Sequence, residues 1–247
     1  MTGASGAAGG DRSTTAFRRT CAAGAVLLVL FAALTVAVAV RHGAPLPGDP
    51  ALHRWPLHHR PPVAVATARA VTATGSGVVP YALAVVAGLI AGRDGTGRRY
   101  AVAGALAVLV LGQLVRFGLM LAVARPRPAA YDWATTASGF SFPSGHTTTS
   151  ALTAGLLAWA VLTRCSLSAA RPAIAVLCLW AVAVGLSRVY LGVHWASDVL
   201  GGWLFASLWL ALAALATAPR GRFALRRTAG HVRAPLEARP PSGPKGP

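Results

Sequence analysis

The sequence predicts an all-α integral membrane protein built as a bundle of six transmembrane helices. Of its 247 residues, 55% are hydrophobic and only 12% are charged, and the mean hydropathy is +0.57. Such a composition is too apolar for an ordinary soluble domain. The apolar residues gather in six runs of a length suited to helices that cross a bilayer.

The first run follows a short basic leader. Residues 1–20 are rich in small residues and contain three arginines, so we expect a disordered cytoplasmic leader. The run Cys21–Val40 carries no charge and is predicted to be the first membrane helix, with a cleaved signal peptide as the alternative. Residues 41–62 contain several prolines and are predicted to form a loop whose histidines face solvent or the interface: His42, His53, His58 and His59.

The remaining five runs complete one membrane domain, residues 21–218. Short polar or proline-containing segments separate them. Residues 219–247 are basic and rich in Pro and Gly, which predicts a disordered cytoplasmic tail. The five predicted helices are Ala70–Gly92, Tyr100–Ala124, His146–Thr163, Pro172–Ser187 and Val199–Ala218.

The distribution of basic residues predicts the orientation in the membrane. Lys and Arg are concentrated in the leader, the tail and the short turns 93–99 and 164–171. By the positive-inside rule both termini are then cytoplasmic, and the connections 41–62, 125–143 and 188–195 face outward. The net charge of +17 is spread over these segments rather than one soluble face, so we expect attraction to lipid surfaces and no nucleic-acid partner.

The cysteines and carboxylates predict no metal site and no cofactor. The three cysteines, Cys21, Cys165 and Cys178, lie far apart with no CxxC spacing. Six carboxylates scattered along the chain offer no evident Mg²⁺ cage. If the protein binds phosphate, arginines must therefore neutralise its charge.

Polar residues cluster between the fifth and sixth runs, from Ser187 to Asp198. Asp198 follows His194 by four residues, a helical spacing that lets the carboxylate hold one imidazole nitrogen and leave the other as a nucleophile or base. Arg188 can supply a fork-shaped cation for a phosphate. A His and an Asp at this spacing can also be a plain surface pair, but charges at a membrane boundary favour a functional site.

A second polar cluster, Phe142 to His146, precedes the fourth run. Ser144 is a natural N-cap and Gly145 lets a ligand approach the backbone, so the first-turn amides can face an anion. His146 is then placed to protonate a leaving oxygen. An ordinary capped helix start is the alternative.

A third cluster, the Arg-Pro-Arg-Pro segment 125–128, follows the third run. Its prolines hold two arginines on a stiff extended chain. An interfacial anchor is the alternative interpretation of this segment.

In order and spacing, these three clusters resemble the type 2 phosphatidic acid phosphatase (PAP2) superfamily, which also contains vanadium haloperoxidases. The family pattern is a Lys, six residues and Arg-Pro, then Pro-Ser-Gly-His, then Ser-Arg, five residues, His, three residues and Asp. Pro143 to His146 matches the second block, and Ser187, Arg188, His194 and Asp198 match the third. The resemblance covers roughly residues 76–218 and implies a PAP2/haloperoxidase-like core of the membrane-bound branch.

The resemblance implies a role for each matching residue. His194 attacks phosphorus to form a phosphohistidine, Asp198 orients His194, and His146 protonates the leaving group. Arg127, Arg188 and the amides around Ser144 and Gly145 bind the phosphate oxygens. One position departs from the pattern, because Met120 stands where the family has Lys; Arg116, one turn earlier, is a candidate replacement, although helical side chains usually tilt toward the N-terminus, away from the site.

The resemblance therefore implies a phosphatase in the cell membrane. The lack of an acidic cluster predicts that it is metal-independent, and the positive-inside rule places its active site on the outer face. Suitable substrates are undecaprenyl diphosphate, phosphatidic acid or phosphatidylglycerol phosphate. A lipid-phosphate binder or carrier without turnover is the main alternative, and a vanadium-dependent haloperoxidase is a weaker one.

Overall fold

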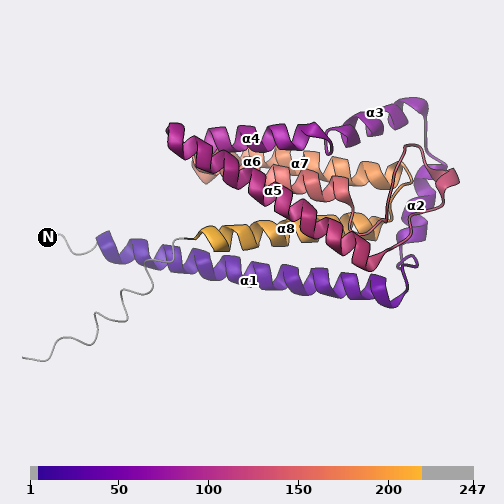
Figure 1. The fold of residues 1–247 in the computed structure, drawn as a ribbon, viewed down its shortest axis with the longest axis horizontal. Helices are drawn as coiled ribbons and strands as arrows, with labels where there is room; N and C mark the ends of the chain where they lie inside the picture. The colour runs from indigo at the N-terminus through magenta and orange to yellow at the C-terminus, as the bar shows by residue number, and fades with distance from the viewer. Residues whose placement is uncertain (1–4, 219–247) are drawn as a thin grey trace, which may run out of the picture.

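The computed structural model describes the backbone of residues 5–218 and the side chains from Thr15 onward. All regular structure in these residues is helical, so the all-α prediction is confirmed for this part of the chain (Figure 1). The elements are α1 (Ser5–Val40), α2 (Asp49–Leu57), α3 (Pro62–Ala73), α4 (Val78–Ala91), α5 (Gly95–Val123), the 3₁₀ turn η1 (Ala130–Asp132), α6 (Gly145–Leu162), α7 (Leu167–Tyr190) and α8 (Ala196–Thr217).

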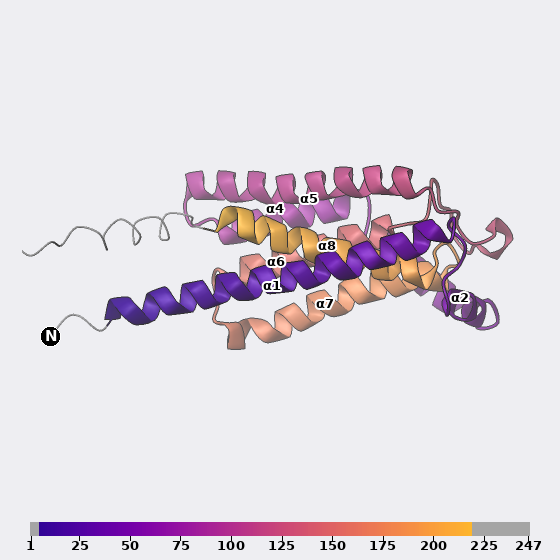
Figure 2. The ribbon, with the colours of Figure 1, turned by 90° about the horizontal axis from the view of Figure 1, so that it is seen from below.

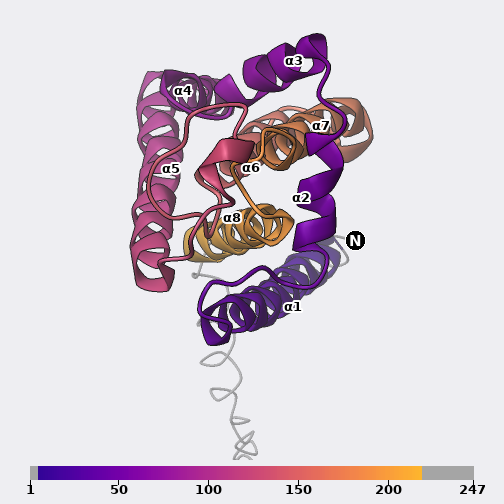
Figure 3. The same ribbon diagram turned by 90° about the vertical axis from the view of Figure 1, so that its right-hand side faces the viewer.

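The long helices lie side by side along one axis, and the short helix α2 crosses one end of the bundle (Figures 1 and 2). α1 packs against α8, and α4 packs against α5. α6 occupies the centre, where it contacts α4, α5, α7 and α8. The two longest connections between helices, residues 124–144 and 41–48, lie at the same end as α2 (Figure 3).

The central helix α6 buries hydroxyl side chains among its neighbours. Most of these hydroxyls donate to a backbone carbonyl three or four residues earlier, as Thr148 does to Ser144 at 2.9 Å and Thr153 to Thr149 at 2.9 Å. Because each such hydroxyl donates a hydrogen bond within the helix, burying it costs little free energy. The buried hydroxyl residues are Thr147, Thr148, Thr149, Ser150 and Thr153.

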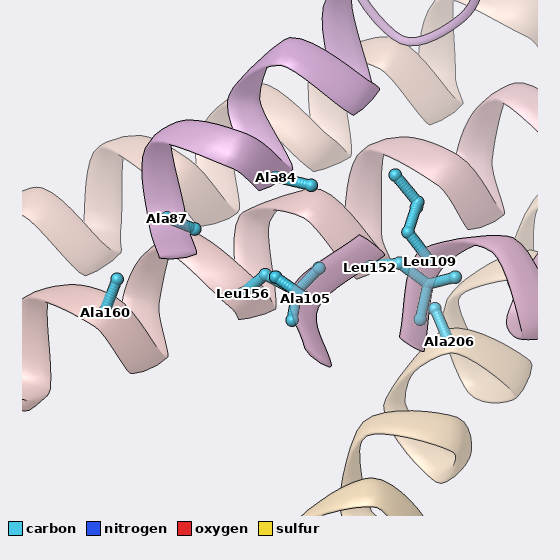
Figure 4. Close-up of a cluster of buried hydrophobic side chains, with 8 residues drawn as sticks. All are labelled: Ala84, Ala87, Ala105, Leu109, Leu152, Leu156, Ala160 and Ala206. Atoms are coloured by element: carbon cyan, nitrogen blue, oxygen red, sulfur yellow. The ribbon is translucent and has the colours of Figure 1, made fainter. Parts of the chain in front are cut away.

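Below this polar turn, α6 joins an apolar core made largely of alanine (Figure 4). Small side chains allow helix backbones to approach closely, which is how helices pack where lipid removes the hydrophobic driving force. Leu109 and Leu152 fill the remaining space and are fully buried. The core comprises Ala84, Ala87, Ala105, Leu109, Leu152, Leu156, Ala160 and Ala206.

In the described residues, four helices are long and apolar enough to cross a membrane: residues Thr15–Val40 of α1, and all of α5, α7 and α8. The pair α3 and α4 adds a fifth candidate if the two helices, bent by 49°, count as one span. α6 is not among them, because its Ser and Thr residues lower its hydropathy. A multi-helix membrane architecture is supported, whereas the number six stays a prediction.

Two segments predicted to be irregular are helical. α1 begins at Ser5, so residues 5–20 continue the first membrane helix instead of forming a disordered leader; extending a helix is far cheaper than nucleating one. Residues 49–57 form α2 within the predicted loop, since Pro50 occupies the first turn, where a helix tolerates proline. The predicted tail, 219–247, lies outside the described residues.

Other helix boundaries in the structure differ from those predicted from the sequence. Asp94 caps α5 by accepting from the amide of Gly97 at 2.6 Å, so α5 takes up most of the predicted 93–99 turn. The predicted span Ala70–Gly92 is broken between α3 and α4. At the break Gly77 adopts a positive φ of 64°, and Gly75 lies so close to Val184 of α7 that a Cβ would clash.

Candidate active site

A pocket of about 470 Å³ lies between α5, α6, α7 and the connections that precede α6 and α8. Six of the eight predicted site residues line it, and the other two, Ser144 and Asp198, are fully buried. Segments more than seventy residues apart in the sequence therefore meet at the end of the bundle shown in Figure 3. The six lining residues are Arg116, Arg127, Gly145, His146, Arg188 and His194.

Two glycines of α8 allow the two histidine segments to meet. A Cβ on Gly202 would lie 2.9 Å from Cβ of Thr147 and 3.1 Å from the carbonyl of Ser144. A Cβ on Gly201 would overlap the ring of Phe142, which is fully buried. The start of α6 thus rests directly on the backbone of α8, and the amide of Ser144 donates to the carbonyl of Asp198 at 3.1 Å.

His194 and Asp198 form the predicted pair. Nδ1 of His194 lies 3.3 Å from Oδ2 of Asp198, and His194 is only 1% exposed. The helix begins at Ala196, so His194 stands in the preceding loop and not on the helix as the spacing had predicted. The carboxylate reaches back instead, because Asp198 in the first turn also accepts from the amide of Trp195 at 2.9 Å.

Arg127 contacts the other imidazole nitrogen. Its Nη1 lies 2.8 Å from Nε2 of His194 and donates to the carbonyl of Val193 at 2.9 Å. Its remaining nitrogens donate to the carbonyls of Ser138, Gly139 and Phe140. Arg127 therefore links the loop 138–140 to His194, and a phosphate would have to replace some of these contacts.

Burial lowers the pKa of His194 to about 4. Desolvation of the imidazolium is the largest cause, and the neighbouring cation of Arg127 acts in the same direction. The hydrogen bond to Asp198 opposes both effects. The imidazole is consequently neutral at physiological pH, the state in which it can act as a nucleophile.

Arg188 and Arg116 bring unused donors to the pocket. Arg188 is 2% exposed and donates through Nη1 to the hydroxyl of Thr72 at 3.1 Å. The Nε atoms of both arginines are buried and have no partner among the described residues. A buried guanidinium that leaves a donor unpaired is costly, which indicates an anionic ligand.

The side chain of Arg116 points toward the C-terminal end of α5, against the usual tilt of helical side chains. Its Nη1 lies 3.4 Å from Sδ of Met120, the residue at the family's Lys position. A Cβ on Gly145 would stand 3.5 Å from the same Nη1. The guanidinium thus reaches the start of α6, where the missing lysine was expected.

Ser144 takes the predicted N-cap position, but its hydroxyl caps no amide and accepts from the hydroxyl of Thr147 at 3.0 Å. Since the amide of Ser144 is bonded to Asp198, it is not free for a phosphate. The amides of Gly145 and His146 have no partner in the described residues, and both residues line the pocket. The amides available to bind an anion are therefore those of Gly145 and His146.

Sequence reasoning missed the charged residues behind Asp198. Arg125, predicted only as part of a stiff segment, is fully buried and donates to Oδ1 of Asp198 at 2.5 Å. Asp49, at the start of α2, lies 2.9 Å from the other end of Arg125. Asp49 is one of only six carboxylates in the chain, and that scarcity was the available signal.

The expectation that the 41–62 histidines face solvent or the interface is wrong for His53. His53 is 5% exposed, and its Nε2 lies 2.9 Å from Oδ2 of Asp132. Its ring packs against Trp195 with ring centroids 5.2 Å apart. The helix α2 is thus docked onto the same end of the bundle as the pocket.

Comparison with known proteins confirms the predicted resemblance. Residues 101–222 match the family model of the PAP2 superfamily. A stretch of 67 residues is 43% identical to phosphatidylglycerophosphatase B of Bacillus subtilis (strain 168). That stretch is 26% of this chain and spans only 33% of the relative.

The fold is shared with two proteins of known structure. A transmembrane PAP2-type phosphatidylglycerolphosphate phosphatase from Bacillus subtilis matches with a TM-score of 0.68 and 26% identity, over 81% of this chain and 98% of that one. LpxE of Aquifex aeolicus matches with a TM-score of 0.54 and 24% identity, over 67% and 93% of the two chains. The second likeness is one of fold alone.

Proposed function

We propose that the protein is a membrane phosphatase that hydrolyses a lipid phosphate or isoprenoid diphosphate through a phosphohistidine. The observation that carries this proposal is the pocket itself. It gathers two histidines and three arginines in one volume, and the nucleophilic candidate is held by a buried carboxylate. Such a site binds a phosphate electrostatically and offers a neutral imidazole to its phosphorus.

In the proposed reaction, Nε2 of His194 forms a bond to phosphorus while the bond from phosphorus to the leaving oxygen breaks. The leaving oxygen takes a proton from His146, which lines the same pocket. Water then attacks the phosphorus and gives a proton to the deprotonated His146, the bond from phosphorus to Nε2 breaks, and phosphate leaves with both histidines restored. Asp198 holds Nδ1 throughout, as the third group does in other nucleophile and base assemblies.

Arginines neutralise the phosphate charge in this proposal. Arg188 and Arg116 line the pocket and have buried, unpaired Nε donors, and Arg127 already contacts the candidate nucleophile. The amides of Gly145 and His146, at the start of α6, add donors at the positive end of a helix dipole. In the described residues no group of three or more His, Cys, Asp or Glu could hold a metal ion.

The relatives favour a lipid phosphate as substrate, since those from Bacillus subtilis are named for phosphatidylglycerol phosphate. We propose the same class of substrate here and keep undecaprenyl diphosphate and phosphatidic acid as candidates. In the proposed topology α3 with α4 and the polar helix α6 complete six spans. Both termini are then cytoplasmic, and the pocket faces outward at headgroup depth, in agreement with the basic turns 93–99 and 164–171.

Phosphate release from these three lipids, with purified protein in detergent, tests the function. Wild type is expected to hydrolyse at least one lipid, and His194→Ala is expected to release none while eluting as the same folded species. Wild-type turnover in His194→Ala would refute the nucleophile. Binding of a lipid phosphate without hydrolysis would favour the carrier alternative, and bromide oxidation with added vanadate would favour a haloperoxidase.

A further inference from the structure

A second buried carboxylate stands behind the nucleophile. Oδ2 of Asp49 lies 2.9 Å from Nη2 of Arg125, and Nη1 of Arg125 lies 2.5 Å from Oδ1 of Asp198. The side chains of Arg125 and Asp198 are wholly inaccessible, and that of Asp49 is 3% exposed. The chain of contacts continues from Asp198 to His194, so Asp49 is linked to the imidazole through two charged groups.

Asp49 is also fastened to the first turn of α8. Its Oδ1 accepts from the amide of Ser197 at 2.9 Å, and its Oδ2 accepts from the hydroxyl of Ser197 at 2.6 Å. The amide of Leu46 donates to Oδ2 at 2.9 Å. These bonds explain why α2 lies across the end of the bundle beside α8 (Figure 3).

The charges of this assembly do not cancel. Asp198 and Arg125 alone would form a neutral pair. The positive charge of Arg125 would then cancel much of the negative electrostatic potential that Asp198 produces at His194. Asp49 adds a second negative charge, so the three groups together carry one net negative charge. The change from a neutral pair to a net negative charge has a strong effect on His194, because little solvent screens charges in a buried site.

Other charged groups near His194 are cationic. Arg127 touches Nε2, and Arg188 and Arg116 line the same pocket. They favour a bound phosphate but oppose positive charge on the imidazole. When Nε2 bonds to phosphorus with Nδ1 still protonated, the ring becomes cationic, and Asp198 together with Asp49 must balance it.

We propose that Asp49 is a positioning residue for the proposed phosphatase reaction. By pairing with Arg125, it keeps the charge of Asp198 directed at Nδ1 of His194 and so stabilises the cationic ring of the phosphohistidine. The inference rests on the proposed function. Asp49 touches no substrate, so its removal is expected to act on kcat and to leave KM nearly unchanged.

The first test replaces Asp49 with Asn, which keeps the size and removes the charge. Asp94→Asn, the same change at the cap of α5 at the other end of the bundle, is the matched control (Figure 1). Asp49→Asn is expected to lower kcat by about 10- to 100-fold, the usual effect of removing a group that orients a reacting one. Asp94→Asn is expected to keep wild-type kinetics; an unchanged kcat in Asp49→Asn would overturn the proposal.

The double variant Asp49→Asn with Arg125→Gln separates charge balance from simple fastening. Without the positive charge at position 125, the negative potential of Asp198 at His194 is no longer offset. The kcat of the double variant is therefore expected to be higher than that of Asp49→Asn. If Asp49 serves only to fasten α2 to α8, the double variant loses a further contact and has a kcat no higher than Asp49→Asn. That outcome would overturn the electrostatic role.

A titration of His194 decides the inference even without turnover. The ¹⁵N signals of histidine-labelled protein in micelles can be assigned to His194 by their loss in His194→Gln. Asp49→Asn is expected to lower the pKa of His194, and the double variant to raise it again; an unmoved titration would overturn the proposal. A wild type that releases no phosphate but shows these shifts would refute the proposed function, and with it the catalytic role of Asp49, while showing that Asp49 still sets the electrostatic field at His194.

Discussion

Nη1 of Arg127 lies 2.8 Å from Nε2 of His194, and this contact defines the tautomer of the imidazole. A guanidinium has only donors, so Nε2 must be the nitrogen with the lone pair. Nδ1 then carries the hydrogen and donates it to Asp198, 3.3 Å away. The imidazole is therefore held in the form that a nucleophile requires, with its lone pair directed into the arginine-lined pocket.

Replacing Asp198 with Asn is expected to leave a small residual activity. The variant keeps the nucleophile but loses the charge that orients Nδ1, and a comparable change in a serine-protease triad lowers kcat on the order of 10⁴-fold. The change also breaks the buried pair with Arg125, which is expected to cost about 3–5 kcal/mol of stability. Steady-state kinetics and the thermal midpoint measure the two effects; wild-type kcat would contradict the assigned role.

Arg127→Gln is expected to weaken inhibition by vanadate, which mimics the phosphorus transition state. Loss of a hydrogen bond to a charged group costs about 1.5–3 kcal/mol, or roughly 10- to 150-fold in the inhibition constant. Arg69→Gln is the control, because Arg69 is exposed and lies outside this pocket. Unchanged inhibition in Arg127→Gln would mean that Arg127 stays bound to the carbonyls of residues 138–140 and never contacts the anion.

Arg116 is expected to replace the lysine that the family carries at the position of Met120. An arginine inside an apolar helix costs about 2.5–3.5 kcal/mol on insertion scales. Arg116 lines the pocket, and its buried Nε has no partner among the described residues. Arg116→Ala is therefore expected to raise KM or lower kcat. Adding Met120→Lys to Arg116→Ala should restore activity, because the new ammonium enters the same pocket.

Protein yield is the control for this pair of variants. If Arg116→Ala lowers the yield but leaves kcat and KM at wild-type values, Arg116 is structural and the pocket binds phosphate with one cation fewer. If Met120→Lys alone reduces activity, the pocket has no room for both cations.

Stability is expected to fall with acidification through the protonation of His194. Its folded pKa of about 4 lies below the usual value of 6.5, so between these values the unfolded chain binds more protons and stability decreases as the pH falls. The complete effect is about 3 kcal/mol. Thermal midpoints between pH 7 and 4.5 should drop more steeply for wild type than for His194→Gln, and parallel curves would contradict the assignment.

Activity is expected to survive exhaustive treatment with EDTA and to be inhibited by vanadate. The reason is that arginines and helix amides, rather than a carboxylate cage, surround the pocket. Phosphate release from a soluble substrate before and after chelation is the measurement. A strict requirement for added Mg²⁺ would contradict the inference that arginines and helix amides neutralise the phosphate charge.

Much of the site could be predicted from local spacing. The four-residue step from His194 to Asp198 predicted a contact that the structure contains, and the segment from Pro143 to His146 supplies two residues that line the pocket. The direction of Arg116 could not be predicted in this way, because rotamer preference pointed away from the site while burial of a charge favours an anionic partner. The close approach of Gly145, at the start of α6, to the guanidinium of Arg116 is visible only in three dimensions.

The sequence by itself determined the membrane class, the all-helical architecture and the pairing of His194 with Asp198, because hydropathy and motif spacing are properties of the chain. Tertiary structure alone decided which charges lie behind that pair. Asp49 and Arg125 are 76 residues apart, and no local pattern links them. They meet because α2 folds across the start of α8, where a buried carboxylate must find a cation and a buried arginine must find carboxylates.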